Sequence, residues 1–275
     1  MDIRIRGISY HLEFHQQKEK LPTMVLLHGF LGSGDSFKPL IPLLAEFSNP
    51  VTIDLLGHGK TQGAELHYRF STKEQVADIV KLISEQLQTP LFLYGYSMGA
   101  RLALQTALHR PDLFQGLLLE SGTFGIEGET ERQVRQSLDG TRSDAIMGNF
   151  EDFLKEWDKK PLFTTNTPTA QTEFYSEIQA GQNPLWMANS LLGFGTGTMP
   201  CVRDRLTDLN TPVQLIAGER DSKFIRINQT MNKDLPESNL SIVERSGHRV
   251  HLEQPEDLAQ IIQHFIATHK LPDIE

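Results

Sequence analysis

Cysteine is nearly absent from this sequence, which holds only Cys201. A single cysteine cannot form an internal disulfide, so the fold does not depend on an oxidising compartment. No apolar run comes near the roughly 20 residues that a membrane-spanning helix needs. Residues 1–6 alternate charged and apolar side chains instead of leading into such a run. We therefore expect a cytoplasmic protein that is neither exported nor inserted into a membrane.

Positive charge is also scarce. The 26 Lys and Arg residues stand against 35 Asp and Glu, which gives a formal net charge of −9. Nucleic-acid binding relies on clustered Lys and Arg that neutralise phosphates, so this balance argues against a nucleic-acid partner. An acidic protein can still enclose a basic pocket, and an anionic small molecule stays compatible with the composition.

Motifs for metals and nucleotides are missing as well. His248 and His251 are too closely spaced for the H-E-x-x-H zinc motif, and a lone cysteine cannot build a cysteine-rich zinc site. No G-x-G-x-x-G motif follows an apolar run, and the chain has no P-loop. We therefore expect neither a metal nor a cofactor.

What the sequence does contain is a regular alternation of short apolar runs and amphipathic stretches. Strands are expected at 3–8, 10–14, 24–27, 51–53, 91–94, 117–119, 213–217 and 240–243, and helices at 37–47, 72–87 and 98–109. The first two strands would form an antiparallel pair at the edge of the sheet. The later alternation predicts an α/β fold with a mostly parallel, doubly wound sheet.

The alternation stops between residues 122 and 200. Helical patches of mixed charge there, such as the one that carries Phe153 and Trp157, predict a helical cap inserted into a core of residues 1–121 and 201–275. An insertion after a core strand lies over the strand ends, where open α/β sheets bind ligands. The glycine-rich residues 193–197 are expected to form the loop from cap to core.

One motif points directly to catalysis. Residues 95–99 read Gly-Tyr-Ser-Met-Gly, which fits G-x-S-x-G between a predicted strand and a predicted helix. The glycines permit a sharp turn that exposes the hydroxyl of Ser97, and the N–H of Met98 at the helix start can stabilise an oxyanion. A second backbone N–H that could donate to this oxyanion is expected at Phe30, just after Gly29. The alternative is a serine that caps an ordinary helix.

A serine hydroxyl becomes reactive only when a neighbouring imidazole accepts its proton. His248 follows the last predicted strand, where this topology presents its base, and we prefer it to His251, which would pack nearby. The orienting acid should follow a strand that lies between the serine and the histidine in the chain. Asp221 fits this place, and Glu219 is the weaker candidate.

Together with Gly29, the turn at 57–59 and Gly247, these motifs resemble the α/β-hydrolase superfamily over essentially the whole chain. Longer strings resemble one family within it, the 2-succinyl-6-hydroxy-2,4-cyclohexadiene-1-carboxylate synthases of menaquinone biosynthesis. These strings are residues 95–101, 119–121, 157–163, 195–200 and 218–224. Ala100 departs from a glycine common at that place in the family, a small change that we expect the fold to tolerate.

The resemblance implies a lyase with an α/β-hydrolase fold. Serine activated by histidine would remove a ring proton and drive the elimination of pyruvate from an enolpyruvyl cyclohexene carboxylate. It also implies that Tyr96, Arg101, Trp157 and Lys223 bind substrate carboxylates, with Arg132 a looser match.

Spacing supports two of these residues independently of the resemblance. Arg101 lies four residues after Ser97, which places it about one turn further along the same helix face, able to pair with a carboxylate. Lys223 follows Asp221 by two residues and can approach the same site. Surface cations are the alternative for both. The expected partner is a small anionic molecule with several carboxylates.

The three predicted catalytic residues do not by themselves separate a lyase from a hydrolase. An esterase, a thioesterase or a carbon–carbon bond hydrolase would use the same residues to form an acyl enzyme or to activate water. A non-catalytic ligand-binding protein is a further alternative, against which the complete triad speaks. The sequence does not fix the oligomeric state, which is either a monomer or a homodimer.

Overall fold

The computed structural model describes residues 1–163 and 170–270. Within them, eight strands form one sheet in the order β1-β2-β4-β3-β5-β6-β7-β8. The strands are β1 Asp2–Ile5, β2 Ile8–Phe14, β3 Thr23–Leu27, β4 Asn49–Ile53, β5 Leu91–Tyr96, β6 Phe114–Glu120, β7 Val213–Gly218 and β8 Ser238–Val243. The pairs β1·β2 and β2·β4 are antiparallel and the remaining pairs are parallel. The predicted mostly parallel sheet with an antiparallel edge is confirmed.

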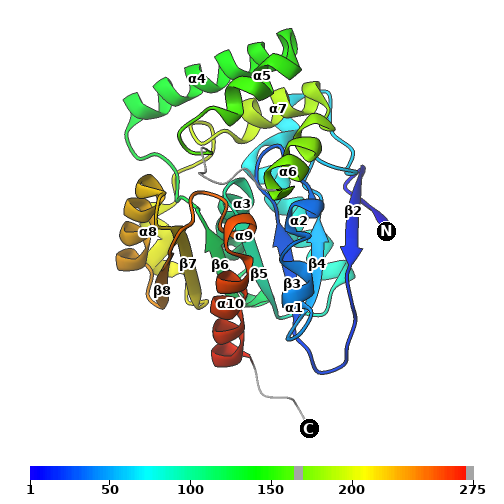
Figure 1. Cartoon of the computed structure of the whole chain (residues 1–275), viewed down its shortest axis with the longest axis vertical. Helices are drawn as coiled ribbons and strands as arrows, with labels where there is room; N and C mark the ends of the chain where they lie inside the picture. The colour runs from blue at the N-terminus through cyan, green and yellow to red at the C-terminus, as the bar shows by residue number, and fades with distance from the viewer. Residues whose placement is uncertain (164–169, 271–275) are drawn as a thin grey trace.

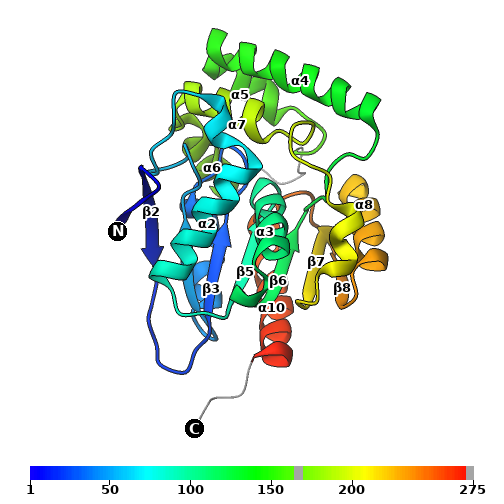
Figure 2. The ribbon, with the colours of Figure 1, turned by 180° about the vertical axis from the view of Figure 1, so that it is seen from behind.

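Helices cover both faces of this sheet. One face carries α1 (Ile41–Leu44), α9 (Val250–Glu253) and α10 (Pro255–His269) (Figure 1). The other carries α2 (Thr72–Gln86), α3 (Met98–His109) and α8 (Ser222–Asp234) (Figure 2). Four 3-10 helices join the described elements, namely η1 Gly34–Phe37, η2 His67–Phe70, η3 Pro111–Leu113 and η4 Arg203–Asp208. The sheet thus has the doubly wound arrangement that the alternation predicted.

The helix expected at 37–47 is wrong in its length. The segment forms η1, a turn and the single turn of α1 instead. Pro39 and Pro42 explain the difference, because each lacks the N–H that a continuous helix would need and clashes with the preceding turn.

The buried faces of the strands explain why the sequence shows continuous apolar runs. In β5, Leu91 and Leu93 belong to the apolar cluster on the α2 and α3 side, whereas Phe92 and Tyr94 belong to the cluster on the α1 and α10 side. Successive side chains of a strand point to opposite faces, so a strand covered on both faces must be apolar throughout. This packing on both faces fixes the position in the sheet at which β5 ends.

Among the described residues, four α-helices occupy the part of the segment between β6 and β7 for which we predicted a cap. They are α4 (Glu129–Gly148), α5 (Phe150–Asp158), α6 (Ala170–Ala180) and α7 (Pro184–Phe194), and they lie together beyond one end of the sheet (Figure 1). A separate apolar cluster that includes Ile146, Phe153 and Met187 joins three of them to Leu31 of the core. Residues 164–169 of the predicted cap lie outside the described residues.

The glycine-rich segment at 193–197 differs in part from the loop that we expected. Gly193 and Phe194 end α7, and the turn begins only at Gly195. A Cβ atom at Gly193 would lie 2.3 Å from the carbonyl oxygen of His67. The glycine therefore allows α7 to pack directly against η2, a long-range contact that the local pattern could not reveal.

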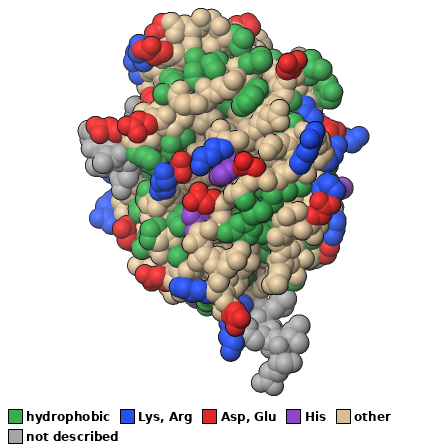
Figure 3. Space-filling model, turned by 90° about the vertical axis from the view of Figure 1, so that its right-hand side faces the viewer, with side chains coloured by type: hydrophobic (Ala, Val, Ile, Leu, Met, Phe, Trp, Pro, Cys, Tyr) green, Lys and Arg blue, Asp and Glu red, His purple; other side chains and the backbone are tan. Residues whose placement is uncertain are grey.

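The surface carries mixed charge. On the face seen in Figure 3, basic and acidic side chains are interspersed with apolar ones, and no continuous basic patch covers that face.

None of the helices in the described ranges has both the length and the apolar character to cross a membrane.

Candidate active site

Ser97 lies on a sharp turn between β5 and α3, with a φ of 50°. This left-handed conformation is strained for a serine. Glycines make the turn possible, because a Cβ at Gly95 would lie 2.5 Å from the carbonyl oxygen of Gly99, and a Cβ at Gly99 would lie 2.1 Å from that of Leu27. The close approach of α3 to β3 thus holds Ser97 at the carboxyl end of the sheet.

The Ser97 hydroxyl begins a chain of hydrogen bonds that ends at a buried carboxylate. Its Oγ lies 3.1 Å from Nε2 of His248, and Nδ1 of His248 lies 2.6 Å from Oδ2 of Asp221. Asp221 caps the N-terminus of α8, and its Oδ1 accepts the N–H of Phe224 at 3.3 Å, which fixes the carboxylate. His248 and Asp221 follow neighbouring parallel strands, β8 and β7. The fold therefore brings three residues from distant parts of the chain together.

His248 is almost completely buried, with 2% of its surface exposed. Burial lowers its pKa from the usual value, and the hydrogen bond to Asp221 offsets only part of this effect. An uncharged imidazole that donates through Nδ1 to the carboxylate leaves the Nε2 lone pair facing the serine. The rings of Tyr96 and Phe224 lie 5.4 and 4.6 Å from the imidazole and hold its orientation.

The alternative base and acid lie elsewhere. His251 is fully buried behind Tyr96, with the two ring centroids 4.5 Å apart, and its Nδ1 lies 2.9 Å from Oε1 of Glu120. Glu219 accepts the N–H of Arg245 at 3.0 Å. His251 thus has the packing place that we expected for it.

A cavity of about 160 Å³ lies between the end of the sheet and the cap. Predicted residues that line it are Phe30, Tyr96, Ser97, Met98, Arg101, Trp157, Lys223 and His248. Arg132 is not among the lining residues, and its Nε donates to the carbonyl oxygen of Gly197 at 3.5 Å. The structure therefore gives Arg132 a contact within the cap instead of a place at the cavity.

The N–H groups of Phe30 and Met98 are suited to an oxyanion. Met98 is the first residue of α3, so its N–H has no partner within the helix. Over the described parts of the chain, neither N–H donates to a backbone carbonyl. Gly29 leaves room for Tyr96, since a Cβ at Gly29 would lie 2.5 Å from Cε1 of that ring.

Positive charge dominates the cavity. Among the described residues its lining contains no Asp or Glu, and its cations are Arg101, Arg135, Arg142, Lys160, Lys223 and Arg249. The sequence predicted only Arg101 and Lys223 of these. Arg135 and Arg142 are seven residues apart, a spacing that places both on one face of a helix and could have suggested them. A cavity of this charge attracts and holds anions.

Arg101 is fixed by its surroundings. It is 9% exposed, its Nη1 donates to the carbonyl oxygen of Phe194 at 2.7 Å, and its guanidinium lies 4.8 Å from that ring. Burial, followed by the charge of Arg135, lowers its pKa to about 9. Burial likewise lowers the pKa of Lys223 and of Arg142. Bound carboxylates would relieve this cost by supplying opposite charge.

Arg249 directly follows the histidine of the hydrogen-bonded chain and was missed by sequence reasoning. Its guanidinium lies 4.5 Å from the ring of Phe163 and 4.1 Å from that of Tyr175, so aromatic rings of the cap cover it. A guanidinium covered in this way presents its N–H groups along its edge.

In the described parts of the chain, no group of three or more His, Cys, Asp or Glu side chains could hold a metal ion.

Comparison with known proteins places this geometry in a class. The sequence matches the model of the alpha/beta hydrolase fold over residues 22–255, so the chain belongs to the α/β-hydrolase family. A 2-succinyl-6-hydroxy-2,4-cyclohexadiene-1-carboxylate synthase of Yersinia pestis bv. Antiqua (strain Nepal516) is 30% identical over 268 residues, which cover 95% of this chain and 93% of that protein. A Bacillus subtilis (strain 168) protein that carries the same name provisionally is 38% identical over 250 residues, 90% of each chain.

The structural comparison agrees with these relatives. The structure of MenH from S. aureus matches with a TM-score of 0.91 at 28% identity, covering 95% of this chain and 99% of that one. The chain is thus a member of the 2-succinyl-6-hydroxy-2,4-cyclohexadiene-1-carboxylate synthase family. The resemblance seen in the sequence motifs is confirmed.

Proposed function

We propose that the chain is a lyase of menaquinone biosynthesis. It eliminates pyruvate from 2-succinyl-5-enolpyruvyl-6-hydroxy-3-cyclohexene-1-carboxylate and leaves 2-succinyl-6-hydroxy-2,4-cyclohexadiene-1-carboxylate. The observation that carries this proposal is the cation-lined cavity directly over the serine and histidine. Membership of the synthase family favours this reaction over hydrolysis.

Ser97, His248 and Asp221 would act as one base. Uncharged His248 accepts the hydroxyl proton of Ser97 across 3.1 Å while the serine oxygen removes a ring proton of the substrate. Asp221 keeps Nδ1 protonated and stabilises the imidazolium that forms. The electron pair of the broken C2–H bond forms a C2=C3 double bond, the existing C3=C4 double bond shifts to C4=C5, and the bond from C5 to the enolpyruvyl oxygen breaks. The departing pyruvate enolate then takes up the proton held by the His248 imidazolium, which restores the uncharged imidazole beside the Ser97 hydroxyl.

The backbone amides and cations would bind the negative charges of this reaction. The N–H groups of Phe30 and Met98 can stabilise an oxygen on which charge develops. The substrate carries carboxylates on its ring, its succinyl group and its enolpyruvyl group. Arg101 and Lys223 line the cavity and can pair with them, and the hydroxyl of Tyr96 can donate a hydrogen bond.

Trp157 would form part of the cavity wall from the cap side. It is 9% exposed and packs 5.5 Å from the rings of Phe30 and Phe163. Its role would be to shape the site and to hold the cation of Lys160, whose Nζ lies 5.0 Å from its ring. Arg132 would bind a substrate carboxylate only after its guanidinium leaves the contact with Gly197 outside the cavity.

The test is pyruvate release from the enolpyruvyl substrate, followed with lactate dehydrogenase. The wild-type protein should release pyruvate, and Ser97→Ala and His248→Ala should each lower the rate at least about a hundredfold while far-UV circular dichroism stays unchanged. A wild-type protein that releases no pyruvate but cleaves an ester or thioester would be a hydrolase instead. Near-normal turnover by either variant would disprove the assigned base.

A further inference from the structure

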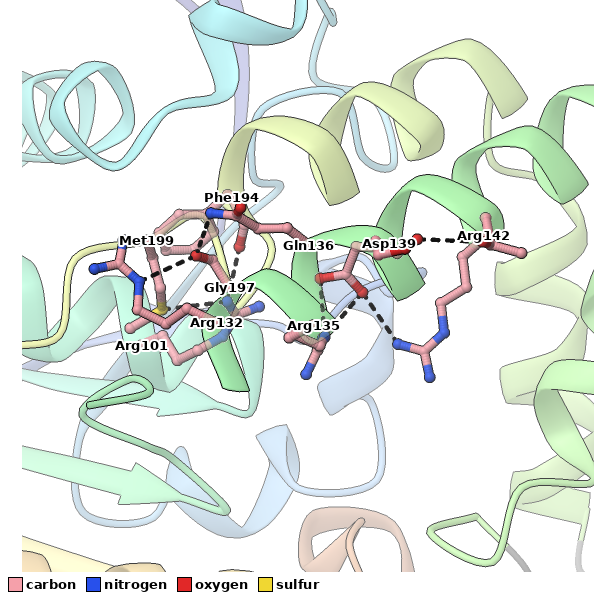
Figure 4. Close-up of polar contacts among 11 residues, drawn as sticks. Arg101, Arg132, Arg135, Gln136, Asp139, Arg142, Phe194, Gly197 and Met199 are labelled. Carbon is pink, nitrogen blue, oxygen red and sulfur yellow. Dashed lines mark hydrogen bonds and ion pairs between the residues drawn. The ribbon is translucent and has the colours of Figure 1, made fainter. Parts of the chain in front are cut away.

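Two of the cavity arginines share a buried carboxylate on their own helix, α4 (Figure 4). Nε of Arg135 lies 2.9 Å from both carboxylate oxygens of Asp139, and Nη1 of Arg142 lies 3.1 Å from Oδ1 of the same group. The Asp139 side chain is 2% exposed, whereas those of Arg135 and Arg142 are 25% and 19% exposed. Asp139 therefore joins the two guanidiniums from the protein side.

Asp139 itself does not line the cavity, although both of its partners do. The Asp139 carboxylate packs closely against the residue that follows α7. A Cβ atom at Gly195 would lie only 2.5 Å from Oδ2 of Asp139. The absence of a side chain at Gly195 thus leaves space for the carboxylate between α4 and α7. This packing restricts the carboxylate, and through it the two arginines.

The contacts leave each guanidinium with further donors. An arginine has five N–H groups in a planar fork, and the contacts with Asp139 use Nε of Arg135 and Nη1 of Arg142. A guanidinium held at one side can offer its remaining N–H groups to an anion with little loss of side-chain entropy. The guanidinium of Arg142 is also held by Trp157, with its Cζ 5.4 Å from the ring.

We propose that Asp139 is a positioning residue, which holds Arg135 and Arg142 as a two-guanidinium clamp for one carboxylate of the substrate. This inference rests on the proposed function and adds how one of the substrate's carboxylates is recognised. Asp139 also supplies a negative charge inside the cation cluster, where Arg101 and Arg135 repel each other. It therefore keeps the cluster in place before the substrate arrives.

Removal of the charge gives opposite results for this proposal and for simple electrostatics. Asp139→Asn deletes a negative charge close to an anionic ligand, so charge alone would tighten binding. If Asp139 acts by holding the arginines, the same substitution loosens them and weakens binding. The sign of the change in KM therefore separates the two explanations.

The experiment compares Asp139→Asn with Asp144→Asn, which removes the same charge from an exposed position of α4. We expect Asp139→Asn to raise the KM of the enolpyruvyl substrate about tenfold, the scale of one lost charge-assisted contact, with kcat within about twofold of wild type. Asp144→Asn should leave both constants unchanged. In an Arg135→Ala/Arg142→Ala background, Asp139→Asn should add less than about twofold, because its partners are already gone.

A lowered or unchanged KM in Asp139→Asn would overturn the proposal. The proposal would also fail if Asp139→Asn raised KM by the same factor in the Arg135→Ala/Arg142→Ala background as in the wild-type protein. Arg135→Lys covers the case in which Asp139→Asn does not fold. Lysine keeps the charge of Arg135 but not its planar fork of N–H groups, so KM should rise, and an unchanged KM would contradict the clamp.

Calorimetric titration with citrate, a tricarboxylate that does not react, separates this proposal from the proposed function. Weaker citrate binding by Asp139→Asn supports the clamp even if wild type releases no pyruvate.

Discussion

At the scale of single residues, burial adapts ordinary side chains to their proposed roles. His248 is enclosed by Tyr96 and Phe224, and desolvation disfavours its charged form more strongly than Asp221 favours it. A base must be uncharged before it can accept a proton. The enclosure of His248 therefore makes an imidazole available as a base throughout the neutral pH range.

The pH dependence of catalysis should report this enclosure. Because the pKa of His248 is lowered from 6.5, the base gains its function as pH rises through a value below 6.5. We expect kcat/KM for pyruvate release to reach half of its plateau value at a pH below 6.5 and to decrease tenfold per pH unit at the acid end. An acid limb centred above pH 7 would contradict the proposed state of His248.

Two arginines near the cavity should behave differently when they are removed. Arg101 lines the cavity and is anchored by Phe194, whereas Arg132 contacts Gly197 outside it. We expect Arg101→Ala to lower kcat/KM by about tenfold or more without loss of folding, and Arg132→Ala to stay within about threefold of wild type. Steady-state kinetics with circular dichroism as the folding control measures both. Equal losses would show that lining the cavity does not decide which arginine binds the substrate.

At the scale of elements, close contacts between backbones decide where Ser97 lies. α3 approaches β3 so closely that a Cβ at Gly99 would lie 2.1 Å from the carbonyl oxygen of Leu27 and 2.7 Å from that of His28. In α4, by contrast, a Cβ at Gly140 would meet nothing within 4 Å. Close packing therefore requires glycine at position 99 but not at position 140.

Alanine at these two glycines should have opposite effects on stability. Gly99→Ala must push α3 away from β3, so we expect a loss of about 3 kcal/mol or more in the free energy of unfolding, with loss of activity. Gly140→Ala should gain about 0.5–1 kcal/mol, because alanine favours the helix and has space. Urea unfolding of both variants measures this difference. A Gly99→Ala protein as stable as wild type would contradict the close approach.

At the scale of the whole molecule, buried histidines link stability to pH. His28 and His58 lie side by side under the cap, with ring centroids 5.2 Å apart, and both are essentially inaccessible to water. Burial lowers the pKa of His28 to about 4 and that of His58 to about 3. Nε2 of His58 has no hydrogen-bond partner, so a proton there would create an unpaired buried charge.

Acidification should therefore destabilise the protein before it affects carboxylates. In the unfolded chain both imidazoles bind protons below about pH 6.5, whereas in the folded chain they bind them only near pH 4 and below. The two uncharged histidines make their full contribution to the free energy of unfolding above pH 6.5. This contribution is lost as pH falls, by about 2 kcal/mol for each histidine at pH 5. Urea unfolding at pH 7 and pH 5 tests this loss. His58→Gln should reduce the pH dependence, and an unchanged dependence would disprove the role of His58.

The sequence by itself determined the fold class and the place of Ser97 in it. Apolar periodicity is a local property, so it located the strands of the parallel sheet and the helices at 72–87 and 98–109. The G-x-S-x-G motif that forms the sharp turn around Ser97 is also local. Because parallel strands end at the same edge, the strand pattern alone assigns the loops that carry Asp221 and His248 to that edge.

Only the tertiary structure decided how the cap completes the cavity. Arg135, Arg142 and Arg249 reach the cavity because α4 packs on α7 and because Phe163 and Tyr175 cover the loop after β8. Arg132 and Arg135 are three residues apart on α4, yet only Arg135 faces the cavity. Contacts between segments distant in the chain decide which face of a helix is turned inward, and such contacts leave no trace in the local pattern of residues.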